Sequence, residues 1–501
     1  MDKKKALFQN IFFILAAALC LMLASRSSFL YPLNNWDDAN SYFSVGKGLF
    51  NGKMPYRDIF DQKGMYLYFF YGLCYLVSHT TFAGVFLMEV ILGAFDIAGM
   101  YRIIRLYIDR GIALALAPVS FAVIVCSRSF WWGGAAEEIC LPFYIWGLYI
   151  VTDYFKNHYE EEVMSFKNVL IGGLLAGMVA NIKYTGLGFF FAWMMMVFFS
   201  YVAKKEFLKG IKACFVFLFG MFVTFIPWII YFGVQGALYE WYWGYVYINV
   251  FFYSKFEDYG PTLFEKIYNL AKLLYWQIRY NWQYYAPALA GLVFTFFGRK
   301  KKLLQRLIIP VLFAFTFLGI FGGGREIPYY GLPLSVFAVF GVALVAVVLD
   351  KLINTNSQSA TAMASALCLG LSLALVYTTS MNIPFMQVSK DDFFLYRFRD
   401  EVLQTEDPTL LNVGCLDAGL YTLCDIVPTC RWFQTQTLDI DEPENNPYLE
   451  QARYVREGLT DYVLVRDDIP GSIDDHYELI DSEEYGWYGY EFTYYLYKKV
   501  R

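Results

Sequence analysis

The sequence predicts a polytopic α-helical membrane protein that ends in a small α/β domain. Of its 501 residues, 58% are hydrophobic and 17% are charged, whereas an average soluble domain carries about 25% charged residues. Long apolar runs recur to about Tyr377, and the chain becomes polar after that point. These observations predict a membrane domain over residues 1–378 and a separate α/β domain over residues 379–501.

The first apolar run, about Leu7–Ser25, is long enough to cross about 30 Å of hydrocarbon. Three lysines, Lys3, Lys4 and Lys5, precede this run, and a single Arg26 follows it. Positively charged flanks stay in the cytoplasm, so we expect the N-terminus to lie inside. The run lacks a clear small-residue cleavage site and is expected to remain as a helix.

Eleven apolar runs are expected to cross the membrane, which corresponds to about eleven transmembrane helices. They lie near residues 7–25, 83–104, 111–126, 138–154, 168–182, 185–202, 210–232, 284–298, 307–321, 330–349 and 360–378. Short lysine and arginine clusters at alternate ends of these runs are expected to be cytoplasmic. That pattern holds only if the apolar stretch Met65–Val77 does not cross. This stretch is short for a span, so we expect an aromatic amphipathic helix along the outer interface.

The resulting topology places the C-terminus and the longest loops on the outer face of the cell membrane. These loops are residues 26–82 and 233–283, whereas the cytoplasmic loops are short. Chemistry is therefore expected outside. Because the basic residues occur only in short clusters between apolar runs, no nucleic-acid partner is expected.

The extracytoplasmic tail is expected to fold as a small α/β domain. Two buried strands, Leu410–Cys415 and Asp461–Arg466, are predicted from their apolar and β-branched residues. Helices are predicted at Asp391–Gln404 and Pro447–Leu459, and Tyr488–Tyr497 alternates as an antiparallel strand would. The tail sequence contains no glycine-rich phosphate loop, so we expect it to act as a scaffold or to bind the acceptor.

The nine cysteines show no spacing typical of a metal site. Cys415, Cys424 and Cys430 lie in the tail, where an oxidising compartment would allow one disulfide and leave one thiol. The alternative is three reduced thiols. The three histidines are far apart in the sequence, so no histidine metal site is proposed.

The first outer loop carries two adjacent acids, Asp37 and Asp38, shortly after the first span. A carboxylate is the natural base for a hydroxyl that attacks an electrophile. Adjacent acids project differently, so one could act as the base while the other forms hydrogen bonds or binds a metal ion. The alternative is an acidic N-cap, because Asp before a helical run commonly caps it.

The same loop carries two cations, Arg57 and Lys63. Either cation could hold the phosphate group of a lipid. The alternative for each is contact with lipid headgroups, or a local salt bridge with Asp58 or Asp61.

Further charged residues lie where predicted spans meet the outer face. Glu137 and Glu138 enter a span, where acids are costly and often functional; the alternative is stabilisation by the helix macrodipole. Lys183 departs from the positive-inside pattern. The alternative to a functional role is that its side chain extends to the lipid headgroups. Arg325 follows three glycines that let the backbone approach an anion, and its alternative is pairing with Glu326.

Together, these residues resemble the GT-C superfamily of glycosyltransferases. The resemblance covers about residues 7–378 and is to bacterial members that use polyprenyl-phosphate sugars, related to protein mannosyltransferases and lipid A aminoarabinose transferase. It rests on an acid after the first span, on Gly46, and on the run Pro55–Gly64, which resembles PYxDxFDxKGP. Counting back from Gly46 places Asp38 at the family's catalytic acid, and Ala39 stands where many relatives have Glu.

The later part of the membrane domain resembles the same family. Arg325, Tyr329 and Tyr330 resemble a late Arg/His-Tyr-Pro element, in which Pro328 occupies the expected His position. The acidic and basic positions of similar chains are matched by Glu137, Glu138 and Lys183.

The resemblance implies an enzyme that transfers a hexosyl or pentosyl group from a polyprenyl-phosphate carrier to an outer-face acceptor, with inversion. Asp38 would be the general base, and the other candidate catalytic acids would be Asp37, Glu137 and Glu138. The donor would be held by Arg57, Lys63, Lys183, Arg325, Tyr329 and Tyr330. The implied partners are the polyprenyl-phosphate sugar, membrane lipid, and an extracytoplasmic glycan, lipid or protein acceptor.

The resemblance leaves the cofactor open. A divalent metal ion near the candidate acids would fit, and some relatives need none. Two other functions also stay open: a transporter or flippase for lipid-linked glycans, and a non-catalytic cell-envelope assembly protein. A transporter would carry charged groups within its spans near the midplane. The predicted spans are poor in charge, which favours the transferase.

Overall fold

The structure is a computed structural model of the chain. It describes residues 3–108, 111–253, 262–297, 302–323, 325–352, 357–436, 438, 440, 442, 445–487 and 489–500. It confirms a mostly helical membrane protein with a small C-terminal sheet.

Two compact units make up the chain. Unit 1 comprises Met1–Ser28, Phe86–Trp228 and Phe256–Ile383, and unit 2 comprises Phe29–Val85, Ile229–Lys255 and Pro384–Arg501. This division differs from the predicted boundary at residue 378. The reason is that side chains from two of the predicted outer loops pack with the tail.

Unit 1 contains all or most of each helix that corresponds to a predicted span. These helices are α1 (Lys3–Ala24), α4 (Ala83–Arg105), α5 (Ile112–Val125), α6 (Ala136–Asp153), α7 (Phe166–Ala180), α8 (Leu187–Ala203), α9 (Phe207–Val234), α12 (Trp282–Phe296), α13 (Leu303–Phe321), α14 (Ala338–Leu352), which continues the 3₁₀ segment η6 (Pro328–Phe337), and α15 (Gln358–Thr379). Seven helices of the described chain are long and apolar enough to cross a membrane. Every predicted span is therefore helical, and the number of crossings stays a prediction.

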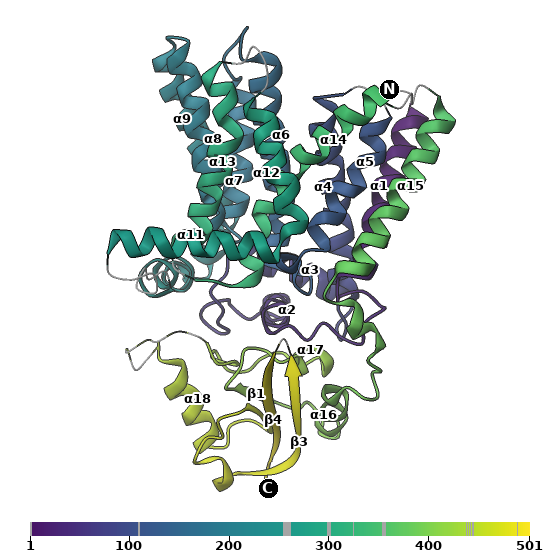
Figure 1. Cartoon of the computed structure of the whole chain (residues 1–501). Coiled ribbons are helices and arrows are strands. Elements are labelled where there is room, and N and C mark those ends of the chain that lie inside the picture. Colours follow the sequence, from purple (N-terminus) through teal and green to yellow (C-terminus); the bar gives the residue numbers. More distant parts are fainter. Residues whose placement is uncertain are drawn as a thin grey trace. The chain divides into compact units, whose positions relative to one another are not determined.

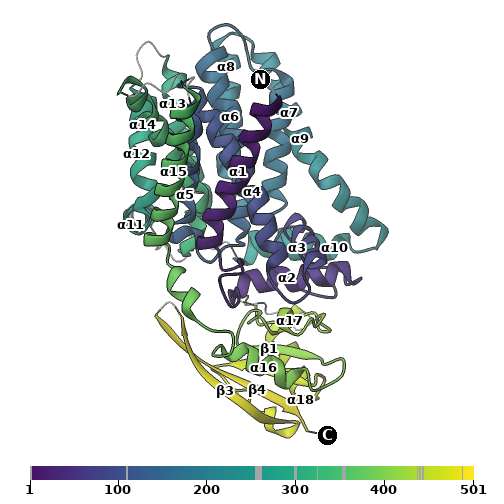
Figure 2. The same ribbon diagram turned by 90° about the vertical axis from the view of Figure 1, so that its right-hand side faces the viewer.

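The helices of unit 1 pack through apolar faces. α5 packs against α1, α14 and α15, and Figures 1 and 2 show α1, α5 and α15 side by side. α8 packs on α13, and α6 packs on α7. α5 is apolar on all sides and almost entirely buried, as expected of a helix with neighbours all round.

One helix of unit 1 lies within the predicted outer loop 233–283. α11 (Leu263–Tyr280) runs crosswise to the long helices of this unit (Figure 1). Leu273 and Gln277 are buried, whereas Phe264 and Ile267 are exposed. An amphipathic helix with an exposed apolar face is typical of a membrane surface.

Unit 2 combines outer loops with the tail. Its elements are α2 (Asp37–Phe50), α3 (Met65–Val77), α10 (Leu238–Trp241), the π-helical segment η4 (Tyr242–Tyr253), α16 (Phe394–Val402), α17 (Leu420–Leu423), α18 (Pro447–Arg456), β1 (Leu410–Val413), β2 (Tyr462–Arg466), β3 (Tyr477–Trp487) and β4 (Tyr490–Lys499).

α2 and α3 form a tight helical hairpin. A Cβ atom at Gly46 would lie 2.6 Å from the backbone nitrogen of Gly72, so only glycine allows this approach. Phe82, beyond α3, packs on Phe43 of α2 with ring centroids 5.4 Å apart. The chain after α3 therefore folds back onto α2. This geometry is consistent with the expectation that α3 does not cross the membrane.

The tail folds around a four-stranded sheet of order β1-β2-β4-β3. β1 and β2 are parallel, and β4 is antiparallel to both β2 and β3. The predicted strands occur as β1, β2 and β4, and the two predicted helices occur as α16 and α18. The sequence did not predict β3, because this edge strand is rich in acids and pairs only with β4. Cys415, Cys424 and Cys430 are buried free thiols, so the structure has the reduced alternative.

Candidate active site

The two adjacent acids occupy the first turn of α2. Trp36 is the N-cap residue, so the alternative of an acidic N-cap is wrong. Negative side chains in a first turn are stabilised by the helix macrodipole. Successive helical residues point about 100° apart, so Asp37 and Asp38 meet different surroundings.

Asp37 forms an ion pair with the tail. The Nη1 atom of Arg466, on β2, donates to the Asp37 carboxylate over 2.9 Å. Both side chains are mostly buried, with exposed fractions of 14% for Asp37 and 15% for Arg466. Burial raises the pKa of the Asp37 carboxyl above its ordinary value, and the charge of Arg466 opposes that rise. Asp37 therefore anchors the start of α2 to the sheet.

Asp38 belongs to a second group of side chains, which we call the Asp38 cluster: Asp38, Tyr42, Asp61 and Lys63. The Tyr42 hydroxyl donates to the Asp38 carboxylate over 3.2 Å, and the Lys63 ammonium lies 5.8 Å from the centre of the Tyr42 ring. Asp61 is buried and accepts a 2.8 Å hydrogen bond from Tyr68. Burial raises the pKa of Asp61, which the charge of Lys63 lowers and the charge of Asp38 raises further. Two acids and one cation thus share a small volume.

The loop Pro55–Gly64 positions this cluster through its own backbone. The Tyr56 hydroxyl donates to the carbonyl of Lys63 over 2.6 Å, and the Lys63 amide donates to the Tyr68 hydroxyl over 2.8 Å. Tyr56 has a φ of 68°, a left-handed conformation that is uncommon for a bulky residue. The sequence suggested Asp61 only as a partner in a local salt bridge and assigned no role to Tyr68, although Asp61 lies within the family-like run.

Arg57 lies in the same loop and is paired locally. Its Nε atom donates to Asp58 over 2.9 Å, and 44% of its side chain is exposed. The local salt bridge that the sequence left open as an alternative is therefore present.

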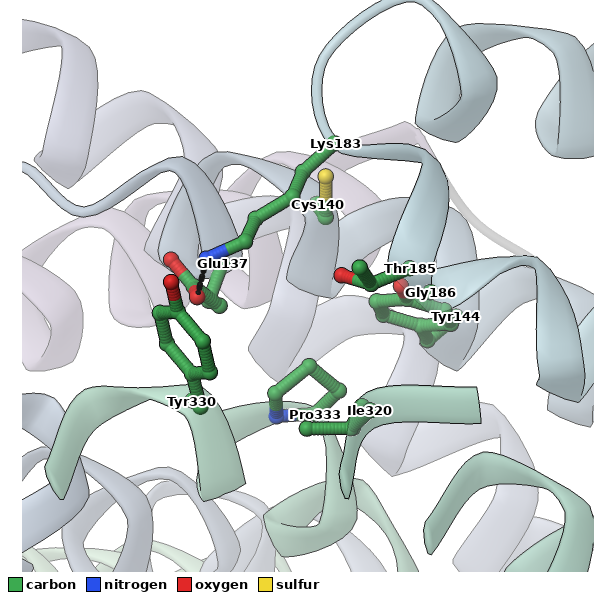
Figure 3. Close-up of a pocket in the computed structure, with 9 residues that line it drawn as sticks. All are labelled: Glu137, Cys140, Tyr144, Lys183, Thr185, Gly186, Ile320, Tyr330 and Pro333. Carbon is green, nitrogen blue, oxygen red and sulfur yellow. Dashed lines mark hydrogen bonds and ion pairs between the residues drawn. The ribbon is translucent and has the colours of Figure 1, made fainter. Parts of the chain in front are cut away.

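A pocket of unit 1, which we call the Lys183 pocket, is lined by the predicted Glu137, Lys183 and Tyr330 among other residues (Figure 3). Glu137 lies in the first turn of α6, and Lys183 directly precedes the 3₁₀ turn η3 (Tyr184–Gly186). The Lys183 ammonium donates to Glu137 Oε1 and lies 3.6 Å from the centre of the Tyr330 ring and 5.5 Å from that of Tyr329. Residues from three distant parts of the sequence thus meet there.

Glu138 faces away from this pocket. It accepts a 2.8 Å hydrogen bond from the amide of Gly134 and lies beside Glu89, whose carboxylate accepts from Ser25 over 2.8 Å. Asp96, two turns further along α4, is also buried. The sequence prediction missed Glu89 and Asp96, although an acid inside an apolar run is itself a signal.

Arg325 is half-buried in unit 1 and does not line the Lys183 pocket. Within the described part of the chain, no group of three or more His, Cys, Asp or Glu side chains is arranged to hold a metal ion.

No protein-family model and no curated protein sequence matches the chain. Solved structures are similar to it. ArnT from Cupriavidus metallidurans, bound to undecaprenyl phosphate, matches with a TM-score of 0.61 at 11% identity, over 96% of this chain and 97% of ArnT. Its apo state matches with a TM-score of 0.58 at 11% identity, over 97% of each chain.

A weaker similarity connects the chain to the Archaeoglobus fulgidus oligosaccharyltransferase. The TM-score is 0.45 at 13% identity, over 91% of this chain and 67% of that enzyme. At such identities, structural similarity establishes the fold alone. The match to ArnT over nearly the whole of both chains shows that this protein has the GT-C membrane fold that its sequence predicts.

Proposed function

We propose that this chain is a membrane glycosyltransferase that moves a sugar from a polyprenyl-phosphate carrier to an acceptor on the outer face. The observation that carries the proposal is that the two acids of α2 have different partners. Asp37 is bound to Arg466, whereas Asp38 lies with Tyr42, Asp61 and Lys63. The fold supports the proposal, because ArnT was solved with undecaprenyl phosphate bound.

The proposed reaction is a single displacement with inversion. An acceptor O–H group loses its proton to the Asp38 carboxylate while its oxygen forms a bond to the anomeric carbon. On the opposite face, the bond between that carbon and the phosphate oxygen breaks. The electron pair leaves with the phosphate, and the products are the new glycoside and polyprenyl phosphate.

Cations stabilise the charge that grows on the departing phosphate. Lys63 is the candidate cation in unit 2, where it lies within the Asp38 cluster. Lys183 and Arg325 are the candidates in unit 1, and Tyr329 and Tyr330 flank Lys183 there. Arg57 is the weaker candidate, because Asp58 already neutralises it.

The tail supports this chemistry as a scaffold for α2. Ser41, Ser44 and Lys47 follow one face of α2 at helical spacing, and each bonds to the tail. Ser41 donates to Gln434 over 2.6 Å, Ser44 donates to Asp417 over 2.5 Å, and Lys47 donates to the carbonyl of Tyr421 over 2.6 Å. We propose that these contacts hold α2 and thereby orient Asp38.

Substitution of the proposed base tests the assignment. Asp38→Asn preserves the side-chain size and an acceptor for Tyr42, but it cannot take up the proton. We expect a rate of sugar transfer at least about 10²-fold lower, measured as polyprenyl phosphate released by the full-length protein from a panel of polyprenyl-phosphate sugars. Asp400→Asn, at an exposed acid paired with Arg399, is the matched control. Sugar transfer at the wild-type rate by a folded Asp38→Asn protein would remove Asp38 from the role of base.

A transporter of lipid-linked glycans is the second candidate function. Glu89 and Asp96 are buried within the apolar helix α4, and buried acids in spans are typical of transporters. Reconstituted vesicles separate the two functions. Movement of lipid-linked glycan that is lost in Glu89→Gln and kept in Asp38→Asn, without a new glycosidic bond, would favour the transporter.

A further inference from the structure

The Lys183 pocket is electrically neutral although it contains a cation suited to phosphate. Its lining includes two charged side chains, Glu137 and Lys183, and they pair with each other. Only 4% of the Glu137 side chain and 11% of the Lys183 side chain is exposed. In such a weakly hydrated place an ion pair is strong. A phosphate that approaches Lys183 therefore competes with a carboxylate that is already there.

The second carboxylate oxygen of Glu137 has different surroundings from the first. Oε2 is buried, and within the described chain it has no hydrogen-bond donor. A buried acceptor without a donor is costly, and the cost is higher for a charged group. If a phosphate bound the Lys183 ammonium, Glu137 Oε1 would also lose its hydrogen-bond donor. The carboxylate would then need a replacement donor from the ligand itself.

The lining of the pocket offers polar groups for such a ligand. The hydroxyls of Tyr144 and Thr185 belong to residues of its lining, and Figure 3 shows them on the far side of the pocket from Tyr330. A sugar attached to the phosphate carries hydroxyl groups that can donate to Glu137. A bare lipid phosphate has no sugar hydroxyl, and its own P–O–H group is mostly ionised near pH 7 because the second pKa of a phosphate monoester is about 6.

We infer that Glu137 makes the Lys183 pocket distinguish a polyprenyl-phosphate sugar from bare polyprenyl phosphate. The inference rests on the proposed function. With the sugar present, Lys183 turns to the phosphate and a sugar hydroxyl donates to Glu137. Once the sugar has been transferred, Glu137 loses that donor, pairs again with Lys183, and displaces the lipid phosphate. Glu137 is thus a substrate-binding residue that also promotes product release.

The first test measures binding of polyprenyl monophosphate to the full-length protein. Glu137→Gln removes the competing charge and keeps the side-chain size, so we expect tighter binding, by about tenfold or more. Lys183→Met should weaken binding. Asp153→Asn removes a carboxylate from the other end of α6, where it bonds to Asn157, and should leave the affinity unchanged. Unchanged or weaker binding in Glu137→Gln would overturn the inference.

A second test uses the wild-type protein and does not depend on the folding of a variant. The inference requires that the wild type bind a polyprenyl-phosphate sugar more tightly than bare polyprenyl phosphate. Equal affinities would overturn it while leaving the proposed function intact. If the wild type bound neither lipid, the proposed function would fail together with the inference.

Discussion

At the scale of the residue, position on a helix gives two chemically identical side chains different partners. Asp37 and Asp38 are adjacent in the sequence, but the 100° rotation between helical neighbours sends one toward β2 and the other toward Tyr42. The same rule explains why Glu137 pairs with Lys183 while Glu138 accepts from Gly134. In both pairs only one acid lies in a site with a lysine that is a candidate for binding phosphate.

The ion pair between Asp37 and Arg466 predicts a large effect on stability. Arg466→Ala leaves a mostly buried carboxylate without its partner, so we expect a loss of about 3 kcal/mol in the free energy of unfolding of the tail and α2. The measurement is thermal unfolding of the purified protein. Arg397→Ala is the control, because its pair with Asp481 is half-exposed and contributes less than about 1 kcal/mol. Equal losses in the two variants would contradict the role of the buried pair.

Asp417 predicts a dependence of stability on pH. Burial raises its pKa from 3.8 to about 6 in the folded protein. The folded state therefore holds this proton more tightly than the unfolded state does, and stability must fall as the pH rises from about 4 to about 6. The fall amounts to about 3 kcal/mol. Lys47, whose pKa burial lowers to about 8, changes protonation only at higher pH.

Asp417→Asn isolates this effect. The amide cannot titrate, so the difference in melting temperature between wild type and Asp417→Asn should change across pH 4 to 6 and stay constant above pH 7. Asp400→Asn, at an exposed acid paired with Arg399, is the matched control. A constant offset for Asp417→Asn across the whole range would refute the raised pKa.

At the scale of the element, glycines decide how α2 and α3 pack. The hairpin carries the Asp38 cluster, since Asp38 and Tyr42 lie on α2 while Tyr68 on α3 holds Asp61. The two backbones approach so closely at Gly46 that a methyl group would meet backbone atoms of α3. Backbone atoms cannot rotate away as a side chain can. The spacing between these two helices is therefore set by the absence of a side chain.

Gly46→Ala should separate the two helices. A Cβ atom there would lie 2.6 Å from the Gly72 nitrogen and 2.7 Å from the Tyr68 carbonyl oxygen, so we expect a loss of about 1–3 kcal/mol in stability and reduced sugar transfer. Gly48→Ala is the matched control, because its nearest contact is the movable end of the Ile59 side chain. The explanation fails if Gly48→Ala harms stability as much as Gly46→Ala does.

At the scale of the whole molecule, unit 2 joins three segments that the sequence predicts to lie outside. Phe60 of the first loop packs on Trp243 with ring centroids 5.7 Å apart, and the Phe60 amide donates to the carbonyl of Arg431 in the tail over 2.9 Å. Segments that pack together in one unit must lie on the same side of the membrane. Their orientation, outside or inside, stays a prediction from the positive-inside rule.

Cysteine labelling tests this orientation. Cysteines introduced at Arg57 and Leu449, both exposed in unit 2, should react with an impermeant reagent added from outside to intact cells. A cysteine at Lys209, exposed in the first turn of α9, should react only after the membrane is permeabilised. Labelling of Lys209→Cys from outside would reverse the topology. Reaction at only one of the two unit 2 positions would contradict their common side.

The sequence by itself determined the class of the molecule. Apolar runs and charged flanks predict the spans, short apolar and β-branched runs predict β1 and β2, and alternation predicts β4. These signals are local, because they depend on which residues are excluded from water. The resemblance of Gly46 and the run Pro55–Gly64 to the GT-C superfamily also made Asp38, rather than Asp37, the predicted base, and that role stays a prediction.

Only the tertiary structure decided which distant residues meet. Arg466 lies 429 positions from Asp37, and Lys183 meets Glu137 and Tyr330 from separate helices. No local pattern encodes such pairs, because they depend on how whole elements pack. The packing also explains why Asp37 is bound to the sheet, and it reveals the partners of Asp38 and Glu137. The physical reason is that a buried charge requires a partner, and the fold, rather than the neighbouring sequence, supplies it.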